Sequence, residues 1–124
     1  GIKFSIWGLS FKPETDDMRE APSINLINSL AKSGAIINAY DPQAIDEAKF
    51  YLKDLEINYF DNKYEALKGS DAVILVTEWK EFRSPDFERM IKLMNGNVFI
   101  DGRNQFNYTD MNTIGFNYFQ IGVK

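Results

Sequence analysis

The sequence predicts an α/β domain with a doubly wound, mostly parallel sheet of about six strands and helices on both faces. Three observations support this fold class. Short apolar runs alternate with segments of helical periodicity, which is typical of successive βα units. The run at 71–77 contains the unbroken apolar stretch AVILV, which indicates a strand buried on both faces. The 124 residues are about the length of one domain.

Each predicted element has a local reason. The first strand, residues 2–9, precedes a helix that begins at Pro22, a residue suited to a first helical position, and ends at Ser33-Gly34. The second strand, residues 35–42, ends at a proline. The later elements are a helix at 43–53, a strand at 57–60, a short helix at 62–68 stopped by Gly69, the strand at 71–77, a helix at 85–94, and two strands at 97–101 and 116–121. No helix is predicted between these last two strands.

Four polar segments follow strands and should meet at one edge of the sheet. With the usual strand order 3-2-1-4-5-6, ligands bind beyond the carboxyl ends of the strands, near the first and fourth. Strands 1 and 5 would flank strand 4 about 10 Å apart, so Lys12 and Arg103 could reach one pyrophosphate or sugar. A lysine point charge and a planar arginine suit a phosphorylated ligand. The four segments are residues 8–21, Asp41-Pro42, Thr77-Glu78-Trp79 and residues 101–104.

Ordinary structural explanations remain open for the same residues. The charged loop at 12–20 is equally consistent with solvated surface, and Asp16 or Asp17 could cap the chain locally or pair with Arg19. Two tryptophans suit packing more than stacking on a ligand, and one segment could be a plain turn with a surface arginine. These are Trp7, Trp79 and the segment Asp101-Gly102-Arg103.

The dinucleotide fingerprint G-x-G-x-x-G is absent after the first strand, where the chain reads GLSFKP. The fold is therefore predicted to be Rossmann-like without the usual means of holding a dinucleotide. Asp41 stands near the position of an acid that contacts a ribose, but a turn or cap role before Pro42 is the favoured interpretation.

Composition excludes several kinds of chemistry. The chain has no cysteine and no histidine, so it has no thiolate nucleophile, no imidazole base and no metal site built on those residues. A net charge of −4 disfavours a nucleic-acid surface. No apolar run is long enough for a membrane span and no signal peptide is visible, so a soluble cytoplasmic chain is expected. The chain begins in strand-like sequence, which suggests an excised fragment.

Taken together, the motifs carry a resemblance to a known family. The stretch GLSFKPETDDMREAPS resembles a motif of the UDP-glucose/GDP-mannose dehydrogenase family, and AYDP, DAVILVTEWKEF and FIDGRN follow in the family's order. The resemblance covers essentially the whole chain, residues 1–124, as a single UDP-binding C-terminal domain, most nearly that of UDP-glucose 6-dehydrogenase. It implies that the NAD-binding domain, the central dimerisation region and the catalytic cysteine of the complete enzyme are absent here.

The resemblance also implies roles for individual residues. Phe11 and Lys12 would line the nucleotide-sugar site, Arg103 would contact the substrate, and Arg19 would reach across a cleft to NAD. No catalytic and no metal-binding residue is expected in this chain. In the resembling enzymes two NAD oxidise the sugar C6 alcohol through a covalent thioester, so the isolated chain should be inactive. The prolines at 13 and 22 would limit the loop's freedom before a ligand binds.

Two alternatives remain beside this interpretation. The substrate of the parent enzyme could be GDP-mannose or UDP-N-acetylmannosamine in place of UDP-glucose. The chain could also be a stand-alone doubly wound binding or regulatory module, such as a receiver-like domain. A receiver needs an aspartate at the end of a central strand, whereas the first strand ends Trp7-Gly8-Leu9 and Asp41 follows the wrong strand.

Overall fold

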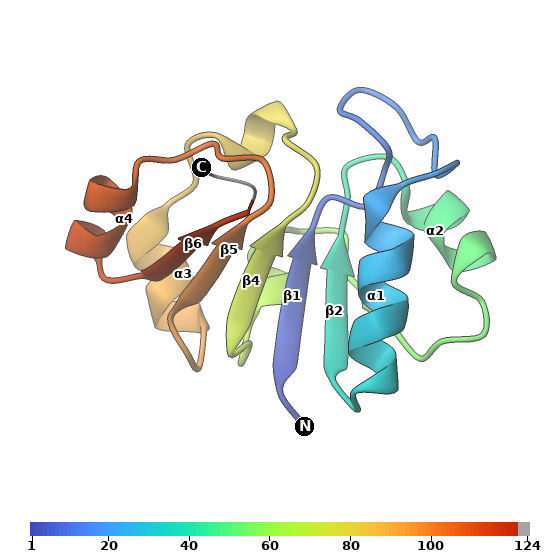
Figure 1. Cartoon of the computed structure of the whole chain (residues 1–124), viewed down its shortest axis with the longest axis horizontal. Helices are drawn as coiled ribbons and strands as arrows, with labels where there is room; N and C mark the ends of the chain where they lie inside the picture. Colours follow the sequence, from blue (N-terminus) through green and yellow to red (C-terminus); the bar gives the residue numbers. More distant parts are fainter. Residues whose placement is uncertain (122–124) are drawn as a thin grey trace.

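The computed structural model describes residues 1–121, and its central feature is a six-stranded sheet in the order β3-β2-β1-β4-β5-β6 (Figure 1). Every neighbouring pair of strands in this sheet is parallel. The predicted fold class and strand order are therefore confirmed. The strands are β1 (Lys3–Trp7), β2 (Ile36–Tyr40), β3 (Asn58–Tyr59), β4 (Ala72–Leu75), β5 (Val98–Asp101) and β6 (Asn117–Gln120).

Helices connect the strands and lie on both faces of the sheet, with α1 and α2 on the near side in Figure 1 and α3 behind. The first of them begins at Pro22, as predicted, because proline already has a helical φ and has no N–H to leave unpaired. The described helices are α1 (Pro22–Lys32), α2 (Ile45–Tyr51), α3 (Phe87–Leu93), α4 (Tyr108–Ile114) and the 3₁₀ helices η1 (Glu65–Leu67) and η2 (Lys80–Phe82).

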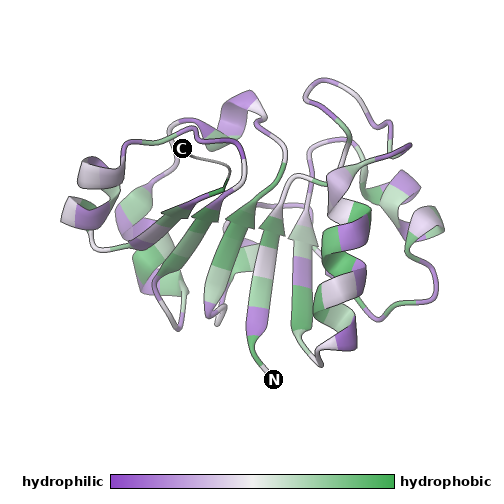
Figure 2. Cartoon of the chain, viewed as in Figure 1, coloured by the Kyte–Doolittle hydropathy of each residue, from purple (hydrophilic) through white to green (hydrophobic). Residues whose placement is uncertain are grey.

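Two different cores fill the two faces, because neighbouring residues of a strand point to opposite sides. Ile6 lies in an aliphatic core with residues of α1 and α2. Trp7 lies in an aromatic core with residues of η1, η2, α3 and α4. There its ring stacks on Phe82 at a centroid distance of 4.9 Å, and its indole N–H donates to the Lys63 carbonyl at 3.1 Å. Figure 2 shows hydrophobic residues concentrated in the strands and polar residues in the loops.

The structure corrects the prediction that no helix separates the last two strands. Helix α4 lies between them and makes β6 parallel to β5. Asn107 caps it by accepting from the Asp110 N–H at 3.1 Å, and Gly115 ends it at a φ of 125°. The helix has only seven residues, with Met111 alone buried, so its apolar period is too weak to recognise in the sequence.

Two further predicted elements are shorter than expected. The predicted helix at 62–68 is reduced to the single 3₁₀ turn η1, which Gly69 follows at a φ of 71°. The predicted first strand ends at Trp7, because Gly8 adopts a φ of 94° that extended structure does not use.

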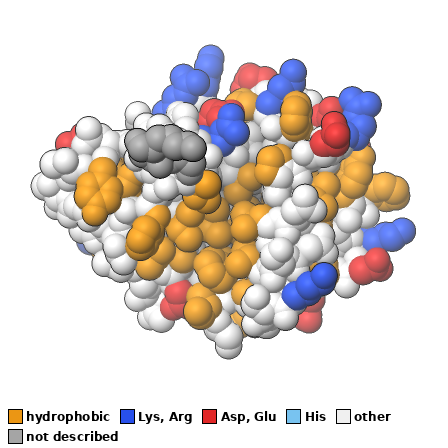
Figure 3. Space-filling model, viewed as in Figure 1, with side chains coloured by type: hydrophobic (Ala, Val, Ile, Leu, Met, Phe, Trp, Pro, Cys, Tyr) orange, Lys and Arg blue, Asp and Glu red, His pale blue; other side chains and the backbone are white. Residues whose placement is uncertain are grey.

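On the aliphatic side, no helix of residues 1–121 lies over β4 and β5 (Figure 1). A groove of about 550 Å³ occupies this position, and Figure 3 shows its hydrophobic surface between α1 and β6. We call it the apolar groove. Its lining includes Phe4, Leu26, Leu30, Ile74, Val76 and Ile100, and Arg103 lies at one end. Parallel sheets usually have both faces covered, so this face is unusual.

Candidate functional site

The loops after β1, β2, β4 and β5 leave the same edge of the sheet, where the parallel strands end (Figure 1). The first loop turns at Gly8. A Cβ there would lie 2.5 Å from the Thr77 Cβ and 2.6 Å from the Thr77 backbone nitrogen. Glycine at this position therefore allows the loops after β1 and β4 to meet closely.

Asp41, which follows β2, joins three of these loops. Its carboxylate is buried and accepts the backbone N–H groups of Leu9 at 2.7 Å and Ser10 at 3.1 Å. It also accepts the backbone N–H groups of residues 43 and 44, which directly precede α2, each at 2.8 Å. The Trp79 indole N–H donates to it at 3.2 Å. The predicted turn role of Asp41 is confirmed, and these contacts leave it no role toward a ribose.

Other buried contacts reinforce this arrangement. The Thr77 hydroxyl donates to the Ser10 carbonyl at 2.7 Å, and the Ser23 hydroxyl donates to the Leu9 carbonyl at 2.6 Å. We call Ser10, Asp41, Thr77 and Trp79 the buried base of the edge, since each is buried. The buried base fixes where the first loop leaves the sheet.

Beyond the buried base, the first loop carries two of the predicted ligand residues. Phe11 is 50% exposed, and the Lys12 side chain is exposed as well. The Phe11 N–H donates to the Asp17 carbonyl at 2.7 Å, and the Ser10 hydroxyl donates to the Lys12 carbonyl at 2.9 Å. Both side chains are therefore held on an ordered backbone yet remain accessible at the surface.

Arg19 pairs with Asp17 within the same loop. Its Nε and Nη2 groups donate to the two carboxylate oxygens at 3.1 and 2.9 Å. The hydrogen bonds from Arg19 lower the pKa of Asp17 from 3.8 to about 2. The pair therefore forms the local contact that the sequence left open. Arg19 also lines a polar hollow of about 380 Å³ with Glu47 and Tyr51 of α2.

The loop after β5 is organised by Asp101. Its buried carboxylate accepts the backbone N–H groups of Arg103 at 2.9 Å and Gln105 at 2.7 Å. The Tyr118 hydroxyl donates to it at 2.6 Å. Burial, and then this hydrogen bond, raise the pKa of Tyr118. The plain turn that the sequence allowed at 101–103 is present, and it presents the arginine outward.

Arg103 forms a contact that sequence reasoning missed. Its Nε donates to the Glu78 carboxylate, which comes from the loop after β4. The arginine side chain is 47% exposed and the glutamate side chain 20% exposed. Opposite charges directly after neighbouring strands were the available signal. We call Phe11, Lys12, Arg19 and Arg103 the exposed rim of the edge, since each is exposed.

The exposed rim contains the predicted site residues but does not join them to one another. Lys12 and Arg103 follow β1 and β5, on either side of β4, as the strand order required. In residues 1–121, no hydrogen bond or ion pair joins the side chains of any two rim residues. Their action on one ligand remains a prediction.

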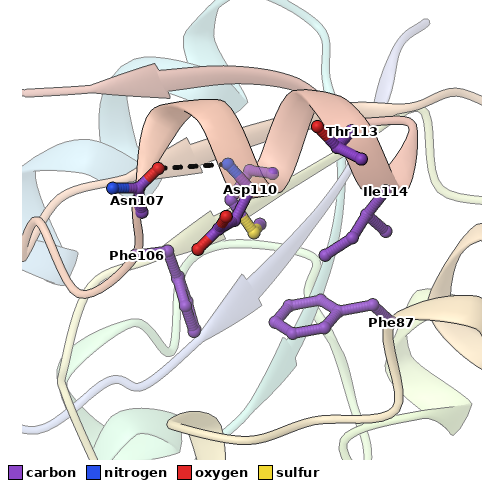
Figure 4. Close-up of a pocket in the computed structure, with 7 residues that line it drawn as sticks. Phe87, Phe106, Asn107, Asp110, Thr113 and Ile114 are labelled. Atoms are coloured by element: carbon purple, nitrogen blue, oxygen red, sulfur yellow. Dashed lines mark hydrogen bonds between the residues drawn. The ribbon is translucent and has the colours of Figure 1, made fainter.

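Another pocket lies between α3 and α4. Figure 4 shows Phe87, Phe106 and Ile114 around it, with the capping contact of Asn107 at its margin. Its volume is about 440 Å³. Phe87 and Phe106 also pack on the aromatic core. Its polar lining residues are Asn107, Asp110 and Thr113. Asn107 is already engaged in the cap of α4, and the Thr113 hydroxyl donates to the Thr109 carbonyl within the same helix.

The charged groups of the edge can bind and orient an anionic ligand through Lys and Arg donors. In residues 1–121 no three histidine, cysteine, aspartate or glutamate side chains lie together as a metal site would require. No helix among these residues is both long and apolar enough to span a bilayer.

A parallel sheet with cationic side chains above its carboxyl edge defines a Rossmann-like ligand-binding domain. The chain belongs to the UDP-glucose/GDP-mannose dehydrogenase family, whose UDP binding domain matches residues 5–108. The family that the sequence motifs indicated is thus confirmed.

Individual relatives agree with this assignment. The chain is 41% identical to a UDP-glucose 6-dehydrogenase of Pseudomonas aeruginosa and 37% identical to one of Rhizobium meliloti, over 98% of its own length. It spans 28% of the length of each.

Solved structures give the same result. An NDP-N-acetyl-D-galactosaminuronic acid dehydrogenase from Methanosarcina mazei matches 100% of the chain with a TM-score of 0.84 and 28% identity. A UDP-glucose dehydrogenase from Pyrobaculum islandicum matches 96% of it with a TM-score of 0.75 and 28% identity. The chain corresponds to 25% of each of these structures.

Proposed function

We propose that this chain binds the UDP part of a nucleotide sugar at the carboxyl edge of its sheet, within an NAD-dependent UDP-glucose 6-dehydrogenase. The parent enzyme would oxidise UDP-glucose to UDP-glucuronate, as a step toward polysaccharides. The observation that carries the proposal is the placement of Lys12 and Arg103 on two ordered loops that flank β4, in a chain that matches a UDP binding domain.

The three proposed substrate-binding residues would each make a different kind of contact with the ligand. Lys12 supplies a compact charge and Arg103 a planar group for phosphate oxygens. Phe11, which precedes Lys12 in the first loop, offers an exposed aromatic ring. These are positioning and electrostatic roles, because the chain contains no cysteine or histidine to act on the sugar carbon.

NAD would be held mainly by other parts of the parent enzyme. The first loop has the single glycine Gly8, whereas a dinucleotide-binding fold has three glycines at this place. The loop therefore lacks the tight glycine-rich turn that binds the pyrophosphate of a dinucleotide. Arg19 is the one residue of this chain that we assign to the cofactor. It lines the polar hollow beside α2, and its pairing with Asp17 would have to yield to the cofactor's charge.

The apolar groove is evidence that another domain of the same parent enzyme packs on this face. It lies over β4 and β5, on a face that a parallel sheet normally covers. The named relatives are more than three times longer than this chain, which leaves room for NAD-binding and central dimerisation domains. We propose that one of these domains covers the groove and that the parent enzyme works in the cytoplasm.

The test is a titration of the ¹⁵N-labelled chain with UDP and with UDP-glucose. Backbone amide signals of residues 11, 12, 14, 15 and 102–104 should shift; Pro13 has no amide hydrogen. The Kd should lie near the millimolar range, a binding free energy of about 4 kcal/mol, because only part of the cleft is present. Lys12→Ala should weaken binding, whereas Lys92→Ala on α3 should not. Shifts confined to the opposite edge of the sheet would refute the site.

The identity of the sugar nucleotide is tested in the same experiment. GDP-mannose and UDP-N-acetylmannosamine are added in parallel, because solved relatives differ in their named substrates. Tighter binding of either than of UDP-glucose would change the proposed substrate while leaving the site in place.

A further inference from the structure

The loop after β4 contacts all three neighbouring loops through three consecutive residues. The Thr77 hydroxyl donates to the first loop at 2.7 Å, and the Trp79 indole donates to the buried aspartate of the second loop at 3.2 Å. Between them, the Glu78 carboxylate accepts from Arg103 in the loop after β5. One short segment therefore connects the loops that carry the proposed ligand residues.

The position of Glu78 is fixed from both sides. Thr77 is 2% exposed and Trp79 is 4% exposed, and each makes its contact inside the buried base. The backbone of Glu78 consequently has little freedom. This fixed backbone positions the Glu78 carboxylate beside the loop that carries Arg103. A surface ion pair with both side chains mobile would lack this anchoring.

The contact with Glu78 also leaves the Nη groups of Arg103 available to a ligand. Glu78 accepts from Nε, which carries one of the five N–H donors of a guanidinium. The two Nη groups carry the other four, and such groups bind phosphate oxygens in pairs. Holding Arg103 through Nε restricts its rotation while leaving the donors that recognise phosphate.

We propose that Glu78 is a positioning residue that holds Arg103 ready for the diphosphate of a nucleoside diphosphate sugar. The inference rests on the proposed function, since it assumes that Arg103 meets that ligand. Removing Glu78 would leave Arg103 to be ordered by the ligand itself, and that ordering should weaken binding roughly three- to tenfold.

An opposite effect is physically reasonable and makes the inference testable. A carboxylate beside an anionic ligand repels it and competes with it for the guanidinium. If competition outweighs positioning, removal of Glu78 strengthens binding. The sign of the change in affinity therefore decides between the two.

The experiment measures UDP affinity of the whole chain by amide shifts for Glu78→Ala, Glu78→Gln, Arg103→Ala and the double variant Glu78→Ala/Arg103→Ala. Glu88→Ala on α3 is the matched control. Glu78→Ala should weaken binding, and Glu78→Gln should recover most of it, because the amide oxygen still accepts from Nε. In the Arg103→Ala background the Glu78→Ala change should have no further effect, which a merely structural role would not predict.

Unchanged or tighter binding by Glu78→Ala, or an equal loss in the Arg103→Ala background, would overturn the inference. Those outcomes presuppose that the unaltered chain binds UDP. A chain that does not bind UDP at all would refute the proposed function and this inference with it. The Nε–H signal of Arg103 without ligand reports on the pair independently of binding. Its hydrogen exchange should be slow in the unaltered chain and in Glu78→Gln, and fast in Glu78→Ala.

Discussion

The buried base and the exposed rim of the carboxyl edge meet at neighbouring residues of the first loop but differ in burial and in hydrogen bonding. Ser10 is buried and its backbone is held by Asp41, whereas Phe11 and Lys12 directly after it are exposed. Side chains of the base are engaged in hydrogen bonds within the domain. Within residues 1–121, those of the rim have either no partner in the fold or a single surface ion pair.

The difference shows how a loop can have a fixed backbone while its side chains remain available to bind a ligand. Asp41 and Asp101 fix the loops after β1 and β5 through backbone N–H groups, so the identity of the rim side chains is not needed for the fold. Changes in the base should therefore act on the free energy of unfolding, and changes in the rim on binding.

Gly8→Ala should produce the largest loss of stability, about 3 kcal/mol or more, because it combines a positive φ with overlap of the new Cβ on Thr77. Urea denaturation of the purified chain measures it. Gly34→Ala is the matched control, since Gly34 has a φ of 83° but open space around it. Its loss should be about 1 kcal/mol. Equal losses would show that the loops do not need to meet closely at Gly8.

Asp41→Asn should destabilise the chain by about 2 to 3 kcal/mol, because a buried carboxylate that accepts five N–H groups is replaced by an amide that offers one acceptor oxygen. Hydrogen exchange at Leu9 and Ser10 should accelerate. Asp54→Asn, at an exposed position, should change stability by less than about 0.5 kcal/mol. Equal losses of stability in Asp41→Asn and Asp54→Asn would show that the buried base does not organise the edge.

Lys12→Ala should leave the unfolding free energy within about 0.5 kcal/mol of the original. In the complete parent enzyme, the same substitution should nevertheless lower the affinity for UDP roughly ten- to a hundredfold, the equivalent of about 1.5 to 3 kcal/mol for a charge-assisted hydrogen bond. A melting curve of the chain and calorimetry of the parent enzyme with UDP measure the two quantities. An unchanged affinity would show that Lys12 is an ordinary solvated surface residue and does not bind the ligand.

The Asp17–Arg19 pair should have the smallest effect on stability, because Arg19 is 79% exposed. The pKa of Asp17 is lowered to about 2, so the pair's contribution is present above pH 3.8 and lost as the pH falls through about 2. A carboxyl NMR titration should show that pKa rising in Arg19→Ala. An unmoved Asp17 pKa in the variant would contradict the pairing.

The same variant tests the cofactor role of Arg19 in the complete parent enzyme. Arg19→Ala should raise the KM for NAD more than the KM for UDP-glucose, and Lys12→Ala should do the reverse. Steady-state kinetics with each substrate varied in turn separate the two. Equal changes in both constants would contradict the division of the rim between the ligands.

Sequence patterns were sufficient for the fold wherever burial is strong. The AVILV stretch identified β4, and the alternation of strands and helices placed it beside β1 in the observed order. Helix α4 was missed because its polar residues show almost no apolar face. The helix forms through its Asn107 cap and the packing of Met111, which are weak signals at the level of sequence.

The site was predictable in part for the same reason. The exposed positions of Lys12 and Arg103 follow from the strand order, and the turn formed by Asp41 follows from local sequence. The contacts of Asp41 with the first loop and with Trp79 join residues 32 and 38 positions apart. Glu78 was missed because its partner is 25 positions away. Such pairings depend on the assembled sheet, which no local pattern specifies.

Those long separations also bear on the order in which the domain folds. Asp41 cannot meet its donors in the first loop and at Trp79 until β1, β2 and β4 lie side by side, so segments that are far apart in the chain must first be brought together at an entropic cost. We therefore expect these contacts to form late in folding, and the loss of a late contact mainly accelerates unfolding. The surface proposed to receive the nucleotide would thus be completed only after these three strands have come together.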